Sequence, residues 1–257
     1  MARFATTRWS LILDARDPAV ARDALEEICR AYRGPVLVYV LRRGYAMADA
    51  EDLTQEFFTR FLESRWHEVA DPARGHFRGL LLTALKRFLI SASKAANTQK
   101  RGGGMFRMEG DSEVDCLFTN ESDAPDEAFE HAWAMTVLER SFARLRAEAE
   151  SAGKAELFRQ LSPHIGEPPL VDEYQRIGAQ LGLRTNTVAV AVHRLRTRLR
   201  DLVHEELADI CDGPDGVAAE LRALREALNR TRARSATAPG APMARSLAAA
   251  IEPEDSA

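Results

Sequence analysis

The stretch YQRIGAQLGLRTNTVAVAVHRLRTRLR, residues 174–200, predicts two short helices joined by a tight turn. Gly178 is expected where the two helices cross closely, and Gly182 supplies a turn residue that tolerates a positive φ. Thr185 is the expected cap of the second helix. This pattern indicates a helix-turn-helix, whose second helix enters the major groove of duplex DNA. Apolar residues recur at the spacing of the two inner faces: Ile177, Leu181, Leu183, Val188 and Val192.

The charge of this stretch also favours DNA as the partner. It contains no Asp or Glu but six arginines, at 176, 184, 194, 196, 198 and 200. An arginine-rich helix is often only a solvated face, but an acid-free run together with the turn glycine and the two-helix spacing favours DNA binding. The candidate reading residues on or beside the outer face are Arg184, Thr185, Asn186, Thr187, Ala189, Val190, His193, Arg194 and Arg196.

Two interpretations of this reading face are open. Arg184, Asn186 or Arg194 could make bidentate contacts to purines, while the methyl groups of Ala189 and Val190 suit thymine. The alternative is that the helix reads sequence weakly and positions the protein through phosphates.

Charge is segregated along the rest of the chain. The 257 residues carry a net charge of -4 and a pI near 5.9, which by themselves do not suggest a nucleic-acid-binding protein. However, residues 74–107 contain eight basic residues and no acidic ones, and residues 109–130 contain nine acidic residues and no basic ones. Because the local potential decides where a polyanion binds, the basic segment is a second candidate for contact with nucleic acid.

Cysteine usage and hydropathy exclude several classes of protein. Cys29, Cys116 and Cys211 lie far apart and have no paired spacing with His, so neither a metal site nor a disulfide framework is expected, and no cofactor is predicted. The N-terminus lacks the apolar run of a signal peptide, and no segment has the length of a membrane span. A cytoplasmic protein is expected.

Apolar periodicity is helical almost throughout and predicts an all-α protein of two small domains. Helices are expected over about 8–29, 35–43, 49–62, 77–100, 127–151 and 154–161, before the helix-turn-helix. The expected domains are residues 1–106 and 126–207, joined by a flexible acidic linker at 107–125 and followed by a short helix and disordered tail at 208–257. That last helix has an apolar stripe expected to pack on its own domain: Val217, Leu221, Leu224 and Leu228.

The segment ADAEDLTQEFFTRFL, residues 48–62, predicts an amphipathic helix with one strongly polar face. Acidic residues near a helix N-terminus are favoured by the macrodipole, so this face alone does not indicate a partner. Its inner face is formed by Ala50, Leu53, Phe57, Phe58, Phe61 and Leu62. Its polar face carries Asp49, Glu51, Asp52, Gln55 and Glu56.

The segment HFRGLLLTALKRFLISASKAANTQKRGGG, residues 76–104, predicts a long basic helix ended by three glycines. Cations and amides on a helix can hold phosphates and read base edges, although charge alone also fits a helix that binds any polyanion. The expected core face is Phe77, Leu80, Leu81, Ala84, Leu85, Phe88 and Leu89. The candidate DNA-binding residues are Lys86, Arg87, Lys94, Asn97, Gln99, Lys100 and Arg101.

DAEDLTQEFF, within this order of segments, resembles the polymerase-docking helix of sigma factors, specifically the extracytoplasmic-function (ECF) type of the sigma-70 family. The resemblance covers roughly residues 7–206. It implies that Asp49, Glu51, Asp52, Gln55 and Glu56 bind the clamp helices of the largest subunit of core bacterial RNA polymerase. It further implies that the basic helix recognises the minus-ten element of promoter DNA and that the helix-turn-helix recognises the minus-thirty-five element.

The same resemblance implies a protein without catalysis of its own, and an inhibitor (anti-sigma) protein is a further partner that the sequence does not identify. The acidic linker would lie in the positive cleft of the polymerase or serve as a simple tether. No aromatic residue occurs between Leu89 and Met105, although stacking platforms commonly use them. Melting of the duplex is therefore assigned to the loop at residues 65–76, with Trp66, His67, His76 and Phe77 as candidates. Trp66 and Phe77 are equally candidates for the core.

Three alternatives remain open at this point. A stand-alone regulator that binds an operator as a dimer would share the helix-turn-helix but leave the docking and basic helices unexplained. A nuclease would require acids or histidines converging near a basic groove, a constellation the sequence does not show. A sigma-like protein that docks without reading a promoter is suggested by Ala189 and Val190.

Overall fold

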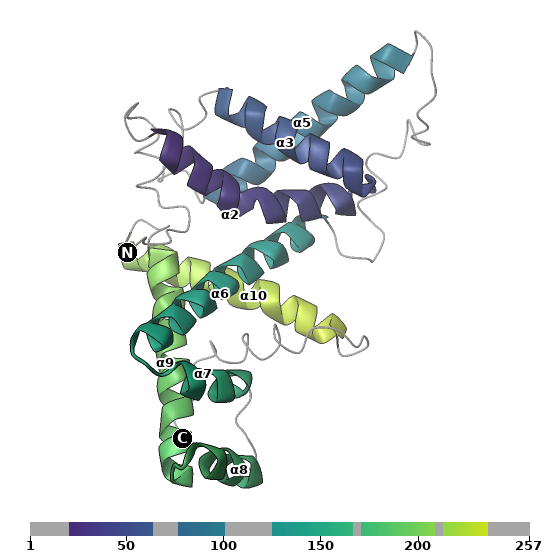
Figure 1. The fold of residues 1–257 in the computed structure, drawn as a ribbon. Coiled ribbons are helices and arrows are strands. Elements are labelled where there is room, and N and C mark those ends of the chain that lie inside the picture. The colour runs from purple at the N-terminus through teal and green to yellow at the C-terminus, as the bar shows by residue number, and fades with distance from the viewer. Residues whose placement is uncertain (1–20, 64–76, 101–124, 167–170, 209–212, 236–257) are drawn as a thin grey trace. The chain divides into compact units, whose positions relative to one another are not determined.

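The computed structural model describes residues 21–63, 77–100, 125–166, 171–208 and 213–235, and within these residues all regular structure is helical (Figure 1). This confirms the predicted all-α class. The chain divides into two compact units, residues 7–132 and residues 133–257 with 1–6. Among the described residues, no helix is long and apolar enough to cross a membrane.

The first unit contains α2 (Ala21–Arg42), α3 (Met47–Glu63) and α5 (Phe77–Lys100). The sequence predicted a break before Pro35, but α2 continues through this proline. Tyr32, Val36 and Tyr39, on both sides of it, are all buried. Burial of one continuous apolar stripe therefore outweighs the cost of a proline inside a helix, about 3 kcal/mol.

Aromatic rings from all three helices form much of the core of the first unit. Tyr32 of α2 meets Phe77 of α5 edge to face, with 5.3 Å between ring centroids. Phe57 of α3 packs against Phe88 of α5 at 5.6 Å. The predicted core face of α5 is wrong at Leu80, which is 38 % exposed, because the helix turns this position away from α2 and α3.

The helix α6 (Pro125–Ser151) begins in the first unit and continues into the second from Trp133. Its first two turns pair with α5: Glu130 accepts from Arg78 at 2.8 Å, and Asp126 from Lys86 at 2.6 Å. Two acids of the 109–130 run thus partner cations of the basic segment. Residues 107–124 of the predicted linker lie outside the described residues, and the predicted domain boundaries stay predictions.

The second unit adds the short α7 (Ala155–Leu161), the 3-10 turn η3 (Ser162–His164), α8 (Val171–Leu181), α9 (Thr185–Ala208) and α10 (Gly213–Ser235). The helices α8 and α9 form the predicted helix-turn-helix. Its core consists of Leu161 from α7, Ile177 from α8, and Val188 and Val192 from α9, each at most 4 % exposed. The third helix, α7, therefore closes the core of the motif.

The turn between α8 and α9 has the predicted glycines for the predicted reasons. A Cβ on Gly178 would lie 2.7 Å from the carbonyl oxygen of Leu183, so only glycine fits this close approach. Gly182 has a φ of 65°, a left-handed conformation that side chains disfavour. Thr185 is the first residue of α9, and the carbonyl of Arg184 accepts the first helical hydrogen bonds, so the prediction of Thr185 as the cap is wrong by one residue.

The helix α10 packs against α9. Leu221, Leu224 and Leu228 of its apolar stripe are buried and Val217 is half-buried. The prediction that this stripe packs on its own domain is therefore confirmed.

Candidate polymerase-binding and DNA-binding surfaces

The polar face of α3 is exposed along its whole length. Phe57, Phe58 and Phe61 anchor the opposite face in the core of the first unit. Glu56 pairs with Arg60 at 2.5 Å, whereas Glu51 and Asp52 have no ion-pair partner among the described residues. All five predicted docking residues lie together on this exposed face: Asp49, Glu51, Asp52, Gln55 and Glu56.

The predicted DNA-binding residues of α5 are described in part. Arg87 and Lys94 are exposed, and Lys86 is half-buried beside Asp126. Asn97 and Lys100 lie in the last turn of the helix, where the side chains are outside the described part of the structure, and Arg101 is not described at all. The structure therefore brings three of the predicted cations onto the described part of one helix.

Of the residues predicted to melt DNA, only Phe77 is described. It is 1 % exposed and packs against Tyr32 and Phe61, so it belongs to the core and cannot stack on a base. Trp66, His67 and His76 lie outside the described residues. The predicted assignment of melting is therefore corrected at Phe77 and stays a prediction for the other three.

The N-terminal half of α9 is strongly exposed. His193 and Arg194 are exposed two turns into the helix, and Val190 is 41 % exposed, a large fraction for an apolar side chain. Val188 and Val192 hold the opposite side of the helix in the core. The structure thus presents together seven of the predicted reading residues: Arg184, Thr185, Asn186, Thr187, Val190, His193 and Arg194.

Arg196 is separated from this set. Its Nε donates to the carbonyl oxygen of Ile165 at 2.6 Å and its Nη2 to that of His164 at 3.0 Å. These carbonyls lie at the end of the α7–η3 segment, and carbonyls at the end of a helix commonly need partners from outside the helix. The guanidinium therefore ties η3 to α9, a role that the sequence did not indicate.

Arg198 is also held within the second unit. It forms a bidentate ion pair with Glu148 of α6, with nitrogen–oxygen distances of 2.7 and 2.8 Å. A further nitrogen of Arg198 pairs with Glu205. The hydrogen bonds from Arg198 hold the pKa of Glu148 below its usual value. Glu205 and Glu206 are joined in turn to Arg144 of α6. The acid-free run is therefore neutralised in part by carboxylates that lie outside it.

Arg184 and Arg194 are the arginines of the run that stay fully available. Arg176 lies 3.6 Å from Glu173, and Arg200 is half-buried. Among the described residues, Arg184 and Arg194 have no ion-pair partner. The cationic character of the reading face rests on these two side chains.

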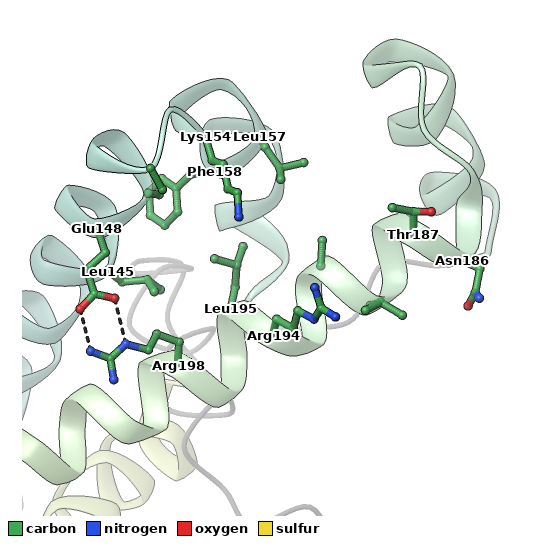
Figure 2. A pocket seen from close by; sticks show the side chains of 14 residues that line it. Leu145, Glu148, Lys154, Leu157, Phe158, Asn186, Thr187, Arg194, Leu195 and Arg198 are labelled. Carbon is green, nitrogen blue, oxygen red and sulfur yellow. Dashed lines mark hydrogen bonds and ion pairs between the residues drawn. The ribbon is translucent and has the colours of Figure 1, made fainter.

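A groove of about 570 Å³ runs beside this face, between the end of α6, the start of α7 and the first half of α9 (Figure 2). Leu145, Leu157 and Phe158 line one wall and Leu195 the other. The pair Glu148–Arg198 closes one end. Four reading residues belong to the same wall as Leu195: Asn186, Thr187, Val190 and Arg194.

Sequence reasoning missed this groove. Its two walls are separated by some thirty residues of sequence, so no local pattern marks them. Lys154, exposed at its rim, is a cation that the sequence analysis did not assign. Among the described residues, no group of three or more His, Cys, Asp and Glu side chains is arranged to hold a metal ion.

Comparison with known proteins finds two similarities. Residues 42–155, from the end of α2 into the start of α7, match the family model described as ECF sigma factor. A relative is the ECF RNA polymerase sigma factor SigE of Mycolicibacterium smegmatis (strain ATCC 700084 / mc(2)155), which is 27 % identical over 190 residues. The aligned part is 74 % of this chain and 65 % of the relative, so the chain spans slightly less than two thirds of the relative's length. No solved structure gave a significant match.

The matched region contains α3 with its exposed polar face and the basic helix α5, and the alignment with the relative extends over most of the chain. Together with the helix-turn-helix formed by α8 and α9, these matches agree with the resemblance found in the sequence: the chain is similar to ECF sigma factors.

Proposed function

We propose that this protein binds core bacterial RNA polymerase and directs it to specific promoters for the initiation of transcription. The exposed polar face of α3 carries this proposal, because its acids Glu51 and Asp52 have no partner among the described residues. Buried phenylalanines fix the orientation of the helix, so the face is preorganised for a partner. The name of the mycobacterial relative supports the same function.

In this proposal the acidic face binds a basic surface on the polymerase. Five side chains of α3 would contact the clamp helices of the largest subunit: Asp49, Glu51, Asp52, Gln55 and Glu56. Complementary charge across such an interface accelerates association and selects the partner.

Promoter DNA is the second partner in the proposal. Arg184 and Arg194 would hold phosphates or purine edges of the minus-thirty-five element, with Thr185, Asn186, Thr187, Val190 and His193 between them. Arg196 is left out of this set, since its guanidinium donates to two carbonyls. The minus-ten element would be bound by α5 and the residue after it, through Lys86, Arg87, Lys94, Asn97, Lys100 and Arg101.

The division of labour with the polymerase follows from this arrangement. Two DNA-binding segments that are each weak gain affinity once both are mounted on one polymerase, because the second contact becomes intramolecular. The polymerase supplies the chemistry of RNA synthesis, so we propose no enzymatic activity for this chain. It would act in the cytoplasm, and an anti-sigma partner stays a prediction from the sequence.

The proposal is tested by gel filtration of the purified protein with core bacterial RNA polymerase. We choose the double variant Glu51→Arg, Asp52→Arg, because Glu56 also pairs with Arg60 and its replacement would disturb a second contact. The matched control is Glu139→Arg, Glu226→Arg, two exposed carboxylates of the second unit whose reversal changes the net charge equally.

We expect wild type and the control to elute with the polymerase as a one-to-one complex and the α3 variant to elute alone. Loss of binding in both variants would assign the effect to net charge and contradict the docking face. No complex with wild type at micromolar concentrations would overturn the proposed function. Specific binding of wild type to a duplex without polymerase, as a dimer, would then favour the operator-binding regulator.

A further inference from the structure

An isoleucine stands on the outer surface of the basic helix α5. Ile90 is 48 % exposed, although its neighbours Leu85 and Leu89 are buried in the core. The helix α5 continues regularly before and after Ile90, so the side chain is exposed because it lies on the outer face of the helix. A single exposed aliphatic residue is normal on a protein surface and by itself carries no function.

The surroundings of Ile90 distinguish it from an ordinary surface residue. Residues three and four apart are neighbours on a helix surface, and those of Ile90 include Lys86, Arg87 and Lys94. Arg87 and Lys94 are exposed, while Lys86 is half-buried and bonded to Asp126 at 2.6 Å. The isoleucine is therefore an exposed aliphatic side chain with cations on both its N-terminal and its C-terminal side along the helix.

The aromatic residues of α5 are engaged elsewhere. Phe77 is in the core, and Phe88 contacts the ring of Phe57 at 5.6 Å, with the guanidinium of Arg60 lying 5.5 Å from its centroid. Apart from Ile90, the exposed large apolar residue of this helix is Leu80, whose neighbours at three and four residues include no cation. Ile90 is thus the apolar group that DNA held by the cations of α5 would meet.

An isoleucine side chain has no donor or acceptor, so it cannot read the hydrogen-bonding edge of a base. It can discriminate through the C5-methyl group, which thymine alone among the four DNA bases carries. The flanking cations would hold phosphates and fix the register in which a base reaches the aliphatic surface.

We infer that Ile90 is a specificity-determining residue that selects thymine in the promoter segment bound by α5, by packing against its C5-methyl group. This inference rests on the proposed function and adds to it a residue and a base. The cations Arg87 and Lys94 position the strand, and Ile90 distinguishes thymine from the other pyrimidine at one position.

The test uses the full-length protein in complex with core polymerase. Promoters randomised in the minus-ten region are first selected by transcription in vitro with the wild-type complex. Each thymine of the selected element is then replaced by deoxyuridine, which removes the methyl group and keeps every hydrogen bond. Stability of the promoter complex is compared for wild type, Ile90→Ala and Ile90→Leu, with Leu80→Ala as the control for loss of an exposed aliphatic residue on the same helix.

Burial of one methyl group predicts that wild type binds the thymine promoter about fourfold more tightly than the deoxyuridine promoter at one position. Ile90→Ala should lose this ratio at that position only, Ile90→Leu should keep most of it, and Leu80→Ala should keep all of it. The inference is overturned if the ratio survives in Ile90→Ala, or if no thymine of the element responds to the replacement. Failure to form a polymerase complex, or to select any promoter, would instead overturn the proposed function and this inference with it.

Discussion

Replacement of Gly178 by alanine tests the geometry of the helix-turn-helix directly. A Cβ at this position would lie 2.7 Å from the carbonyl oxygen of Leu183, closer than the 3.4–4 Å of ordinary van der Waals contact. The obstructing atom is backbone, so no side-chain rotation can relieve the clash. The amide of Leu183 donates to the carbonyl of Gly178 at 2.8 Å, so a shift of the turn also strains this hydrogen bond.

The magnitude follows from two opposing effects. Replacing a helical glycine by alanine stabilises a helix by about 1 kcal/mol. Forcing extra volume into a packed contact costs about 1–3 kcal/mol. We therefore expect Gly178→Ala to lower the free energy of unfolding by about 1 kcal/mol.

The matched control is Gly79→Ala in α5, since a Cβ there has nothing within 4 Å. Gly79→Ala should raise the free energy of unfolding by about 0.5–1 kcal/mol, because only the propensity effect acts. Urea unfolding followed by circular dichroism measures both variants. The reasoning is refuted if Gly178→Ala stabilises the protein as much as Gly79→Ala does, because the close crossing of α8 and α9 would then be absent in solution.

Three further predictions concern charge and thiol chemistry. Asp126→Asn should free Lys86 for DNA, so the polymerase complex should bind minus-ten fork DNA more tightly. In fluorescence anisotropy titrations, the slope of log affinity against log salt concentration should steepen by about 0.7–0.9. An unchanged slope would contradict this competition. Glu148→Gln should lower stability by about 0.5–1 kcal/mol at pH 7 through loss of the pair with Arg198. The pKa of Glu148 is lowered in the folded state, so this stabilisation is present above pH 4.5 and should vanish as the pH falls through the lowered pKa, which thermal melts at pH 7 and pH 3 would show. Burial raises the pKa of Cys29 to about 11, so a smaller fraction of its thiol is ionised at pH 8. With the other two cysteines replaced by serine, Cys29 should react with Ellman's reagent about 100-fold more slowly in the folded protein than in the unfolded chain, and equal rates would contradict the burial.

The sequence predicted the features that depend on local periodicity. The bounds of α5 agree with the structure, and the two helices of the helix-turn-helix lie where the apolar spacing put them. Gly178 and Gly182 were assigned correctly because a crossing and a turn impose requirements that only a few residue types meet. Helix bounds and turn glycines can be predicted because they depend on residues that are close together in the sequence.

The errors arose where distant segments decide the outcome. Local rules end a helix at Pro35, but buried residues on both sides keep α2 intact. The acid-free arginine run favoured DNA binding and Arg196 was a predicted reading residue, yet the carbonyl of Ile165 accepts from Arg196, and Glu148 of α6 pairs with Arg198. Partners some thirty to fifty residues away are invisible to a local count of charges. The contacts of Arg196 within its own unit could therefore not be predicted from the run itself.

The groove beside α9 has a consequence for any change made to the residues that we propose contact DNA. Asn186, Thr187, Val190 and Arg194 form part of its wall, so each substitution made to test their proposed contact with DNA also changes the shape of the cavity. The proposed DNA contacts and the shape of the cavity therefore depend on the same short stretch of α9. Leu145 and Phe158, on the opposite wall, come from α6 and α7. Substitutions at these two positions change the shape of the cavity without altering the residues proposed to contact DNA, so they separate the two effects.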